Sequence, residues 1–219
     1  MDIRLPFDKD GCRIAVIVAV VAVLLGHIST NLGWFGFLLA VGCLLFFRDP
    51  DRLPPSKTSV AVSPADGIVL KIQESAPPEE LDLKGPRKKI SIFMSLFNVH
   101  VNRSPVVGVV EKMVYVPGKF FNVTLDKASD FNERQVIQVK TADGVKVVFV
   151  QIAGLIARRI RCDVAEGDEL ALGQRIGLIR FGSRLDVYLP MDAEILMEEG
   201  QVTVAGETVL ANLKKKAGK

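Results

Sequence analysis

The clearest pattern along the chain is a change in the spacing of its hydrophobic residues. Residues 14–25 form an unbroken apolar run (IAVIVAVVAVLL), and residues 34–47 form another (WFGFLLAVGCLLFF). The stretch between them, GHISTNLG, is polar or carries glycine. Neither run alone reaches the roughly 20 residues that a helix needs to cross the hydrocarbon core, although flanking residues lengthen both. The pattern predicts an apolar helical hairpin, either as two short membrane spans or as one hairpin lying in the interface.

Positive charges flank this hairpin, and the break between its two runs has none. The flanking cations are Arg4, Lys9 and Arg13 before it and Arg48, Arg52 and Lys57 after it. By the positive-inside rule, both ends face the cytoplasm, which places the rest of the chain on the cytoplasmic side of the cell (inner) membrane. A cleaved signal peptide and a buried hairpin of a soluble core are the alternatives. The second apolar run does not suit a signal peptide, and a helix that is apolar all round needs more cover than this chain supplies.

A linker follows the hairpin at residues 48–57, where the sequence RDPDRLPPSK is charged and rich in proline. Proline lacks the backbone N–H that a helix interior needs, so the second apolar helix ends here. We therefore divide the chain into a membrane-associating hairpin (1–47), this linker (48–57) and a domain that occupies residues 58–219.

The domain consists of short runs rich in Val and Ile, separated by Gly, Pro, Asp or Asn, a pattern typical of strands. Examples are VAVSPADGIVLKI, KKISIFM, VVGVVEKMVYVPG, VIQVKTADGVKVVFVQI, RIGLIRFG and RLDVYLP. Ala142-Asp143-Gly144 predicts a β-hairpin, since Asp-Gly suits a tight turn with positive φ. Short helices are expected at 125–129 and 154–161. The fold class is therefore mainly β, a sandwich or barrel with a few short helices, preceded by the apolar hairpin.

Composition removes several classes of function. A net charge of +3 and an aromatic content of 7% argue against a nucleic-acid partner. The two His residues, 27 and 100, are too few for a His-rich metal centre. Cys12, Cys43 and Cys162 do not suggest a disulfide framework.

Candidate chemistry sits in three places in the domain. Asp66, in Ser-Pro-Ala-Asp-Gly, directly precedes a predicted strand. A carboxylate in such a position is most often a turn residue. His100 is the domain's only His, so any chemistry that depends on imidazole must use it. The third place is Gly182-Ser183, between two predicted strands, where glycine permits close backbone approach. Each signal is weak by itself.

Taken together, these segments resemble the phosphatidylserine decarboxylases, in the short form that carries an apolar N-terminal anchor. The resemblance covers nearly the whole domain, and its motifs stand in the matching order. They are FFRDPDRLPP (46–55), SPADGIV (63–69), FMSLFNVHVNRSP (93–105), VPGKFFN (116–122), NERQ (132–135) and GQRIGLIRFGSRLDVYLP (173–190).

The resemblance implies a proenzyme that makes its own cofactor. The Ser183 hydroxyl would attack the Gly182 carbonyl, splitting the chain into a β chain, residues 1–182, and an α chain, residues 183–219, whose first residue becomes a pyruvoyl group. No metal is expected. A serine hydroxyl is a poor nucleophile without an oriented base, and Asp66, His100 and Ser183 form the plausible set. Gly182 would leave the attacked carbonyl uncrowded.

The implied reaction converts phosphatidylserine to phosphatidylethanolamine and carbon dioxide through a Schiff base between the substrate amine and the pyruvoyl group. His100 is the candidate proton donor. Arg103 and Arg184 are candidates for pairing with the lipid phosphodiester. Longer family members carry two His around the central motif, whereas here Arg103 occupies the second place, so the division of work between self-cleavage and turnover stays open.

The expected partners are the phospholipid substrate, the membrane surface and the two chains of one precursor. The sequence leaves the oligomeric state open, a homo-oligomer included. A rival interpretation rests on residues 164–174 (VAEGDELALGQ), which are similar to lipoyl and biotinyl modules and would suit a non-enzymatic, membrane-anchored adaptor. That interpretation lacks the carrier lysine and leaves His100 and Gly182-Ser183 unexplained.

Overall fold

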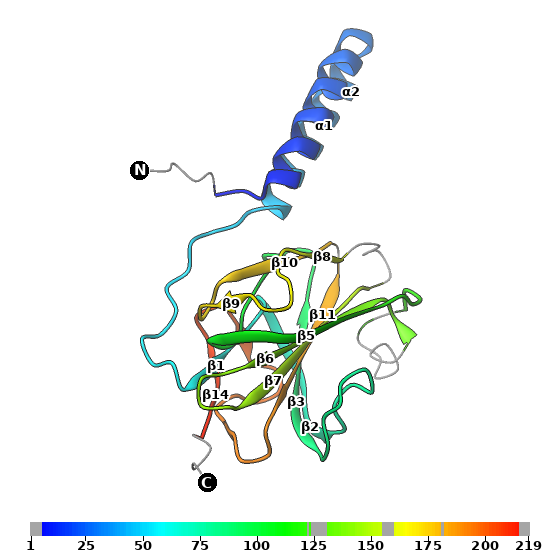
Figure 1. Ribbon diagram of the computed structural model, residues 1–219. Coiled ribbons are helices and arrows are strands. Elements are labelled where there is room, and N and C mark those ends of the chain that lie inside the picture. Colours follow the sequence, from blue (N-terminus) through cyan, green and yellow to red (C-terminus); the bar gives the residue numbers. More distant parts are fainter. Residues whose placement is uncertain (1–5, 122, 124–130, 155–159, 181, 215–219) are drawn as a thin grey trace. The chain divides into compact units, whose positions relative to one another are not determined.

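The structure, a computed structural model, describes residues 6–121, 123, 131–154, 160–180 and 182–214. The chain forms two compact units, Met1–Asp51 and Arg52–Lys219 (Figure 1). The first is helical, and the second is built from strands.

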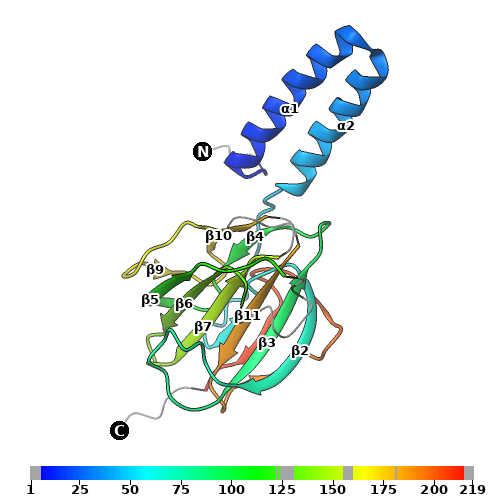
Figure 2. The same ribbon diagram turned by 90° about the vertical axis from the view of Figure 1, so that its right-hand side faces the viewer.

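The helical unit is a hairpin of α1 (Lys9–Ile28) and α2 (Thr30–Phe46) (Figure 2). The helices lie so close that a side chain on Gly33 would collide with the backbone of Gly26, and one on Gly36 with Ala22. The polar stretch between the apolar runs is not an eight-residue break, as the sequence suggested, because only Ser29 separates the helices. Helical backbone satisfies its own hydrogen bonds, which favours continuing both helices from the apolar runs into this polar stretch.

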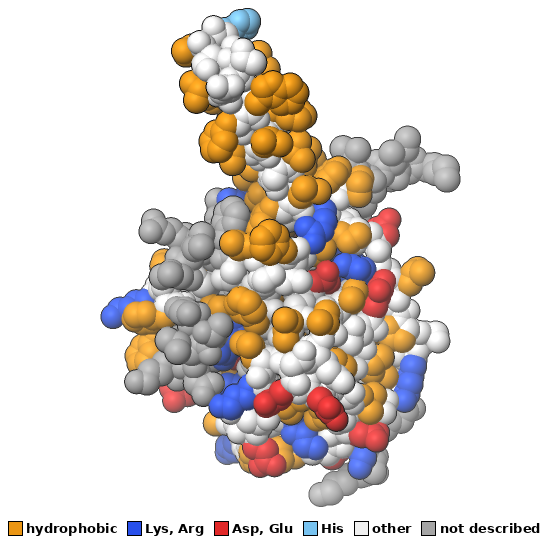
Figure 3. All heavy atoms as spheres, turned by 180° about the vertical axis from the view of Figure 1, so that it is seen from behind, with side chains coloured by type: hydrophobic (Ala, Val, Ile, Leu, Met, Phe, Trp, Pro, Cys, Tyr) orange, Lys and Arg blue, Asp and Glu red, His pale blue; other side chains and the backbone are white. Residues whose placement is uncertain are grey.

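Hydrophobic side chains cover the outer surface of this hairpin (Figure 3). By length and composition, α1 is long and apolar enough to cross a membrane, whereas α2, with 17 residues, falls short of that length. The structure thus contains one apolar helix that could anchor the protein to a membrane. Whether the hairpin spans the bilayer, and which side the second unit occupies, stay predictions.

The second unit is mainly β, which confirms the predicted fold class. In the described residues, its largest sheet is curled and has eight strands (Figures 1 and 2), in the order β13 (Val202–Thr203), β2 (Gly67–Ser75), β3 (Arg87–Met94), β11 (Ser183–Leu189), β7 (Lys146–Ile152), β6 (Arg134–Lys140), β5 (Gly108–Val116) and β9 (Glu169–Leu170). Two smaller sheets accompany it, namely β1 (Val60–Val62), β14 (Val209–Asn212) and β12 (Glu194–Ile195), and β4 (Val101–Arg103), β10 (Arg175–Ile179) and β8 (Ile160–Cys162).

The predicted hairpin at Ala142-Asp143-Gly144 is confirmed, because β6 and β7 pair along their whole length in antiparallel register and Gly144 has a φ of +75°. The predicted helix at 125–129 lies outside the described residues, as does most of the one at 154–161. The end of the second helix is wrong, since residues 160–161 belong to β8, which pairs with β10.

Strand β11 runs through the middle of the large sheet, between β3 and β7, and is buried along both faces. Because side chains alternate along a strand, Leu185, Val187 and Leu189 point to one face and Asp186 and Tyr188 to the other. The first three belong to the main hydrophobic core, while Tyr188 packs in a second cluster with Val148, Val150 and Ile152. The first residue of this strand is Ser183.

Candidate active site

Ser183 begins β11 and faces the main core. It is fully buried and lies directly opposite Met94, the last residue of β3. Its hydroxyl donates to the Met94 Sδ over 3.4 Å. A thioether is a weak acceptor, so this bond holds the hydroxyl only loosely.

The backbone on the N-terminal side of Ser183 has a conformation and a setting that favour glycine. Gly182 has a φ of +61°, in the left-handed region where other residues are strained. Its carbonyl oxygen lies against the backbone of Gly154, where any side chain would collide with it. Two glycines therefore fix the position of the carbonyl that the sequence singled out for attack.

Asp66 directly precedes β2 and lies at the same end of the large sheet as Ser183. Strand β3 pairs with β2 on one side and with β11 on the other, so Gly67, the residue after Asp66, lies two strand spacings, about 10 Å, from Ser183. One carboxylate oxygen accepts the backbone N–H of Ala205 at 2.8 Å. The other accepts the guanidinium of Arg52, also at 2.8 Å.

His100 is fully buried and directly precedes β4. In the β4–β10 pairing, Val101 lies opposite Leu178, two residues before Arg180 on the segment that leads to Ser183. The ring Nδ1 lies 2.9 Å from the carbonyl oxygen of Asn98. A carbonyl accepts, so Nδ1 carries the proton in the neutral ring and Nε2 is left with the lone pair that a general base needs.

A chain of buried hydrogen bonds starts at Ser183 and links three side chains that the sequence analysis did not single out, those of Met94, Asn102 and Gln151. Asn102 donates to the same Met94 sulfur at 3.6 Å, and Gln151 donates to the Asn102 side-chain oxygen at 2.8 Å. Asn102 and Gln151 are fully buried, and the Gln151 Oε1 has no hydrogen-bond partner among the described residues. A lone glutamine in the apolar run VVFVQI was the available signal, because an amide in such a run needs a buried partner.

Arg52 is a second residue whose role the sequence analysis missed. It stands in the linker among the cations that flank the hairpin, but its guanidinium pairs with Asp66, and only 16% of its side chain is exposed. Lys57 likewise donates to the Asn212 side chain. Folding thus places a carboxylate beside Arg52, which its position in the linker did not indicate.

The structure buries both arginines that were candidates for the lipid phosphodiester. Arg103 donates to the carbonyl of Gly173 at 3.1 Å. Arg184 points away from the Ser183 face and binds both oxygens of Asp186, each at 2.7 Å. Substrate binding by Arg103 and Arg184 stays a prediction, and these contacts weigh against it for Arg184.

Cys162, the domain's one thiol, lies on β8 and is partly buried. Burial raises the pKa of this thiol, so it stays protonated at neutral pH. Cys162 is therefore poorly suited to act as a nucleophile in place of Ser183. Among the described residues, no group of three or more His, Cys, Asp or Glu side chains is placed to hold a metal ion.

Comparison with known proteins decides the family. Residues 39–211 match the family model described as phosphatidylserine decarboxylase. The chain belongs to the phosphatidylserine decarboxylase family. It is 51% identical to the phosphatidylserine decarboxylase proenzyme of Paramagnetospirillum magneticum, over 97% of this chain and 89% of that protein. Proteins of the same name from Cereibacter sphaeroides and Rickettsia akari are 52% and 48% identical, each over 95% of this chain and 90% of theirs.

Membership in the phosphatidylserine decarboxylase family makes this chain a decarboxylase, an enzyme of the lyase class. The matched range contains all the residues assembled above, from Arg52 and Asp66 to Gly182 and Ser183. The printed names of these relatives call them proenzymes, that is, precursors of an enzyme.

Proposed function

We propose that this protein converts phosphatidylserine to phosphatidylethanolamine and carbon dioxide, using a pyruvoyl group made from its own Ser183. The observation that carries the proposal is a fully buried serine, preceded by a left-handed glycine, at the start of a central strand. That it stands in a chain of the phosphatidylserine decarboxylase family supports assigning this unusual site to self-cleavage.

In the proposed maturation, the Ser183 Oγ attacks the Gly182 carbonyl carbon, and the C–N bond breaks as the acyl group moves to oxygen. The ester then eliminates, releasing Gly182 as a free carboxylate and leaving dehydroalanine at residue 183. Water hydrolyses the dehydroalanine, ammonia departs, and a pyruvoyl group remains. Every atom comes from the chain and one water molecule.

The geometry supports this series of maturation steps at three points. The hydroxyl must leave only the weak sulfur acceptor of Met94 before it attacks. The packing of the Gly182 carbonyl against Gly154 holds the attacked group still. His100, with its proton held at Nδ1, offers Nε2 as the base for the Ser183 proton.

Asp66 acts as a positioning carboxylate in this proposal. The Ala205 N–H and the Arg52 guanidinium each donate to one of its carboxylate oxygens, which fixes the carboxylate at this end of the sheet. A fixed anion there would stabilise the imidazolium that forms when His100 takes the serine proton.

For turnover, a pyruvoyl group at residue 183 supplies a ketone for the substrate amine and takes up the electron pair left when carbon dioxide departs. His100 then delivers a proton to the carbon that lost its carboxylate. The burial of this region keeps bulk water from competing for that step.

The apolar hairpin suits such a substrate, because a lipid with two acyl chains has a negligible monomer concentration in water and must be met at a bilayer. We propose that α1 and α2 hold the enzyme there, with the second unit on the cytoplasmic side. Deleting residues 1–47 should leave self-cleavage intact and lower turnover on vesicles far more than on detergent-dispersed lipid. Equal losses in both assays would contradict a role in reaching the bilayer.

Intact mass spectrometry tests the proposed chemistry directly. The purified protein should contain two chains, residues 1–182 and 183–219, and the shorter should be lighter than a serine-initiated peptide by one ammonia. Ser183→Ala should leave one chain and no activity, while Ser104→Ala, a change at an equally buried serine, should still cleave. His100→Gln and Asp66→Asn should slow cleavage.

A single intact chain with decarboxylase activity would overturn the pyruvoyl mechanism. An intact chain without activity would indicate either a family member that does not mature or the membrane-anchored adaptor that residues 164–174 suggested.

A further inference from the structure

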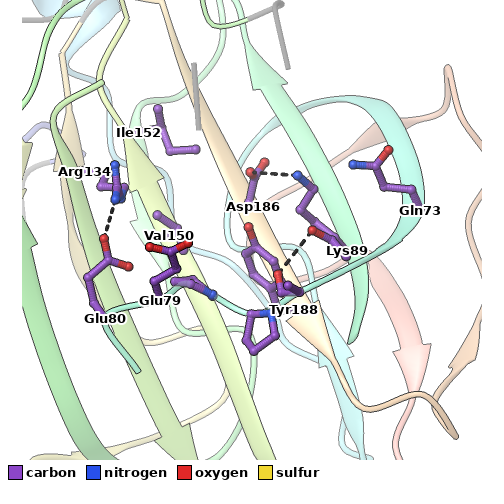
Figure 4. A pocket seen from close by; sticks show the side chains of 13 residues that line it. Gln73, Glu79, Glu80, Lys89, Arg134, Val150, Ile152, Asp186 and Tyr188 are labelled. Atoms are coloured by element: carbon purple, nitrogen blue, oxygen red, sulfur yellow. Dashed lines mark hydrogen bonds and ion pairs between the residues drawn. The ribbon is translucent and has the colours of Figure 1, made fainter. Parts of the chain in front are cut away.

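A cavity of about 480 Å³ lies on the face of the large sheet that Arg184, Asp186 and Tyr188 share, opposite the face of Ser183. Strands β2, β3, β6, β7 and β11 contribute its sheet side, and residues 75–80 complete its wall (Figure 4). Its volume is within the range of about 300–1,000 Å³ that small-molecule sites occupy. The inferred site uses only contacts on this face, so it does not rest on the proposed chemistry at Ser183.

Lys89 brings an incompletely satisfied positive charge to this cavity. Its side chain is 8% exposed, and its Nζ lies 3.9 Å from the Asp186 Oδ2, beyond hydrogen-bond length. Both oxygens of Asp186 are already held by Arg184 at 2.7 Å. Within the described residues, the Lys89 Nζ donates no hydrogen bond, and its other contact is the ring of Tyr188, at 5.8 Å from the centroid. An ammonium carries three donors, so those of Lys89 are left for a ligand.

Glu80 brings an incompletely satisfied negative charge. Its Oε1 pairs with Arg134, while its Oε2 is buried without a hydrogen-bond partner among the described residues. A buried carboxylate oxygen without a donor is costly, so this atom favours a ligand N–H. Figure 4 shows the Arg134–Glu80 pair on one side of the cavity and Lys89 with Asp186 on the other.

The two sides therefore offer complementary ends to one molecule. We propose that this cavity binds a small zwitterion with a primary ammonium, of the class of aminoalkyl phosphates and amino acids. The anionic end lies at Lys89. The ammonium lies at the Glu80 Oε2, beside the exposed carboxylate of Glu79. Together with Arg184, which pairs with Asp186, the positive charges of Lys89 and Arg134 balance the negative charges of Glu79, Glu80 and Asp186, which disfavours a ligand with a large net charge of either sign.

Isothermal titration calorimetry on the full chain in detergent micelles tests this site, with phosphoethanolamine and L-serine as zwitterionic probes. Inorganic phosphate and ethanolamine each carry one end only. The titrations are run on the purified protein and on Ser183→Ala, which cannot react with amines at residue 183. At least one zwitterion should bind to both forms. The probes that carry only one charged end should bind at least about tenfold more weakly.

Added phosphatidylethanolamine distinguishes the two sources of this chemistry. If a lipid headgroup is the occupant, the lipid will compete with phosphoethanolamine for the site. If a free small molecule is the occupant, the lipid will leave the titration with phosphoethanolamine unchanged.

Two variants locate the site. Lys89→Met keeps the length of the side chain and leaves Asp186 paired with Arg184, and Glu80→Gln removes the charge that faces the ammonium. Each should weaken zwitterion binding about tenfold or more. Lys140→Met, at an exposed position on β6, should leave it unchanged. Thermal melting accompanies each titration, so that loss of binding is distinguished from loss of folding.

The proposal is overturned if no zwitterion binds at about 10 mM, a concentration that would reveal even weak millimolar affinity. It is also overturned if phosphate alone binds as tightly as phosphoethanolamine, or if folded Lys89→Met and Glu80→Gln proteins bind as the parent does. Binding that is lost in Ser183→Ala would place the ligand at residue 183 instead.

Discussion

The two faces of strand β11 differ in how they treat polar side chains, although their residues alternate in the sequence. On the face that packs into the main hydrophobic core, called here the inner face, Ser183 contacts the sulfur of Met94 within a neutral network that includes Asn102 and Gln151. On the opposite face, which lines the cavity and is called here the outer face, Arg184 and Asp186 form a doubly hydrogen-bonded ion pair with Lys89 nearby. One face is uncharged and weakly bonded, and the other is charged and tightly bonded.

The difference shows what each face is suited to do. A hydroxyl that must move to attack a neighbouring carbonyl is best held by a weak acceptor, and the inner face provides one. The outer face instead holds a buried, doubly hydrogen-bonded pair of Arg184 and Asp186, which is rigid and leaves the donors of Lys89 unused among the described residues. Arg184 therefore belongs to a different environment from Ser183, its neighbour in the chain. The following predictions test that contrast.

Gly154→Ala should have the largest effect on the inner face. The new methyl group would collide with the Gly182 carbonyl oxygen, and displacing a reacting group by about 1 Å can cost about a hundredfold in rate. Self-cleavage, followed on gels after cell-free synthesis, should slow by at least that factor. Gly42→Ala, where an added methyl group meets nothing within 4 Å, is the matched control. Cleavage at the parental rate in Gly154→Ala would show that this contact does not position the scissile bond.

Asp186→Asn should have the largest effect on the outer face. It keeps the shape of the side chain but leaves the buried Arg184 and Lys89 without their shared counter-ion, a change that costs about 3–5 kcal/mol. The melting temperature should fall by about 10 °C, since about 1 kcal/mol corresponds to about 2–4 °C at this size. Asp143→Asn, in the exposed β6–β7 turn, should barely change it. An unchanged melting temperature for Asp186→Asn would mean that the outer-face charges are not coupled.

The two uncharged side chains of the Asn102–Gln151 pair should show a smaller coupling energy on the inner face. Asn102→Leu or Gln151→Met alone leaves a buried amide without its partner, at a cost of about 1–3 kcal/mol each. The double variant should cost less than the sum of the two, with a coupling of about 0.5–3 kcal/mol in a denaturation cycle. Strict additivity would indicate that the two amides do not interact in solution.

The comparison between sequence and structure is most instructive at particular residues. The β6–β7 hairpin followed from Asp143-Gly144, because a tight turn is a local property of two residues. The extent of the helices did not, since GHISTNLG reads as a break whereas the chain stays helical on both sides of Ser29. Local polarity was outweighed there by backbone hydrogen bonding within an apolar hairpin.

For the site, the sequence named Asp66, His100, Gly182 and Ser183, and the structure places Asp66 and Ser183 at one end of the large sheet, with His100 beside the strand pair that leads to Ser183. It did not indicate Arg52 as the partner of Asp66, because their side chains meet only when the linker folds against the domain. Nor did it indicate Gly154, whose importance lies in the carbonyl oxygen of a distant residue.

By itself, the sequence determined the mainly β fold class, the apolar helices and the residue types available for chemistry, because hydrophobic periodicity and turn chemistry act over a few neighbouring residues. Only the tertiary structure decided which side chains share an environment. Alternation along β11 directs Ser183 and Arg184 to opposite faces, and strand pairing brings Met94 to one and Lys89 to the other. The physical reason is that cross-strand neighbours are fixed by register, which is set by the packing of the whole sheet.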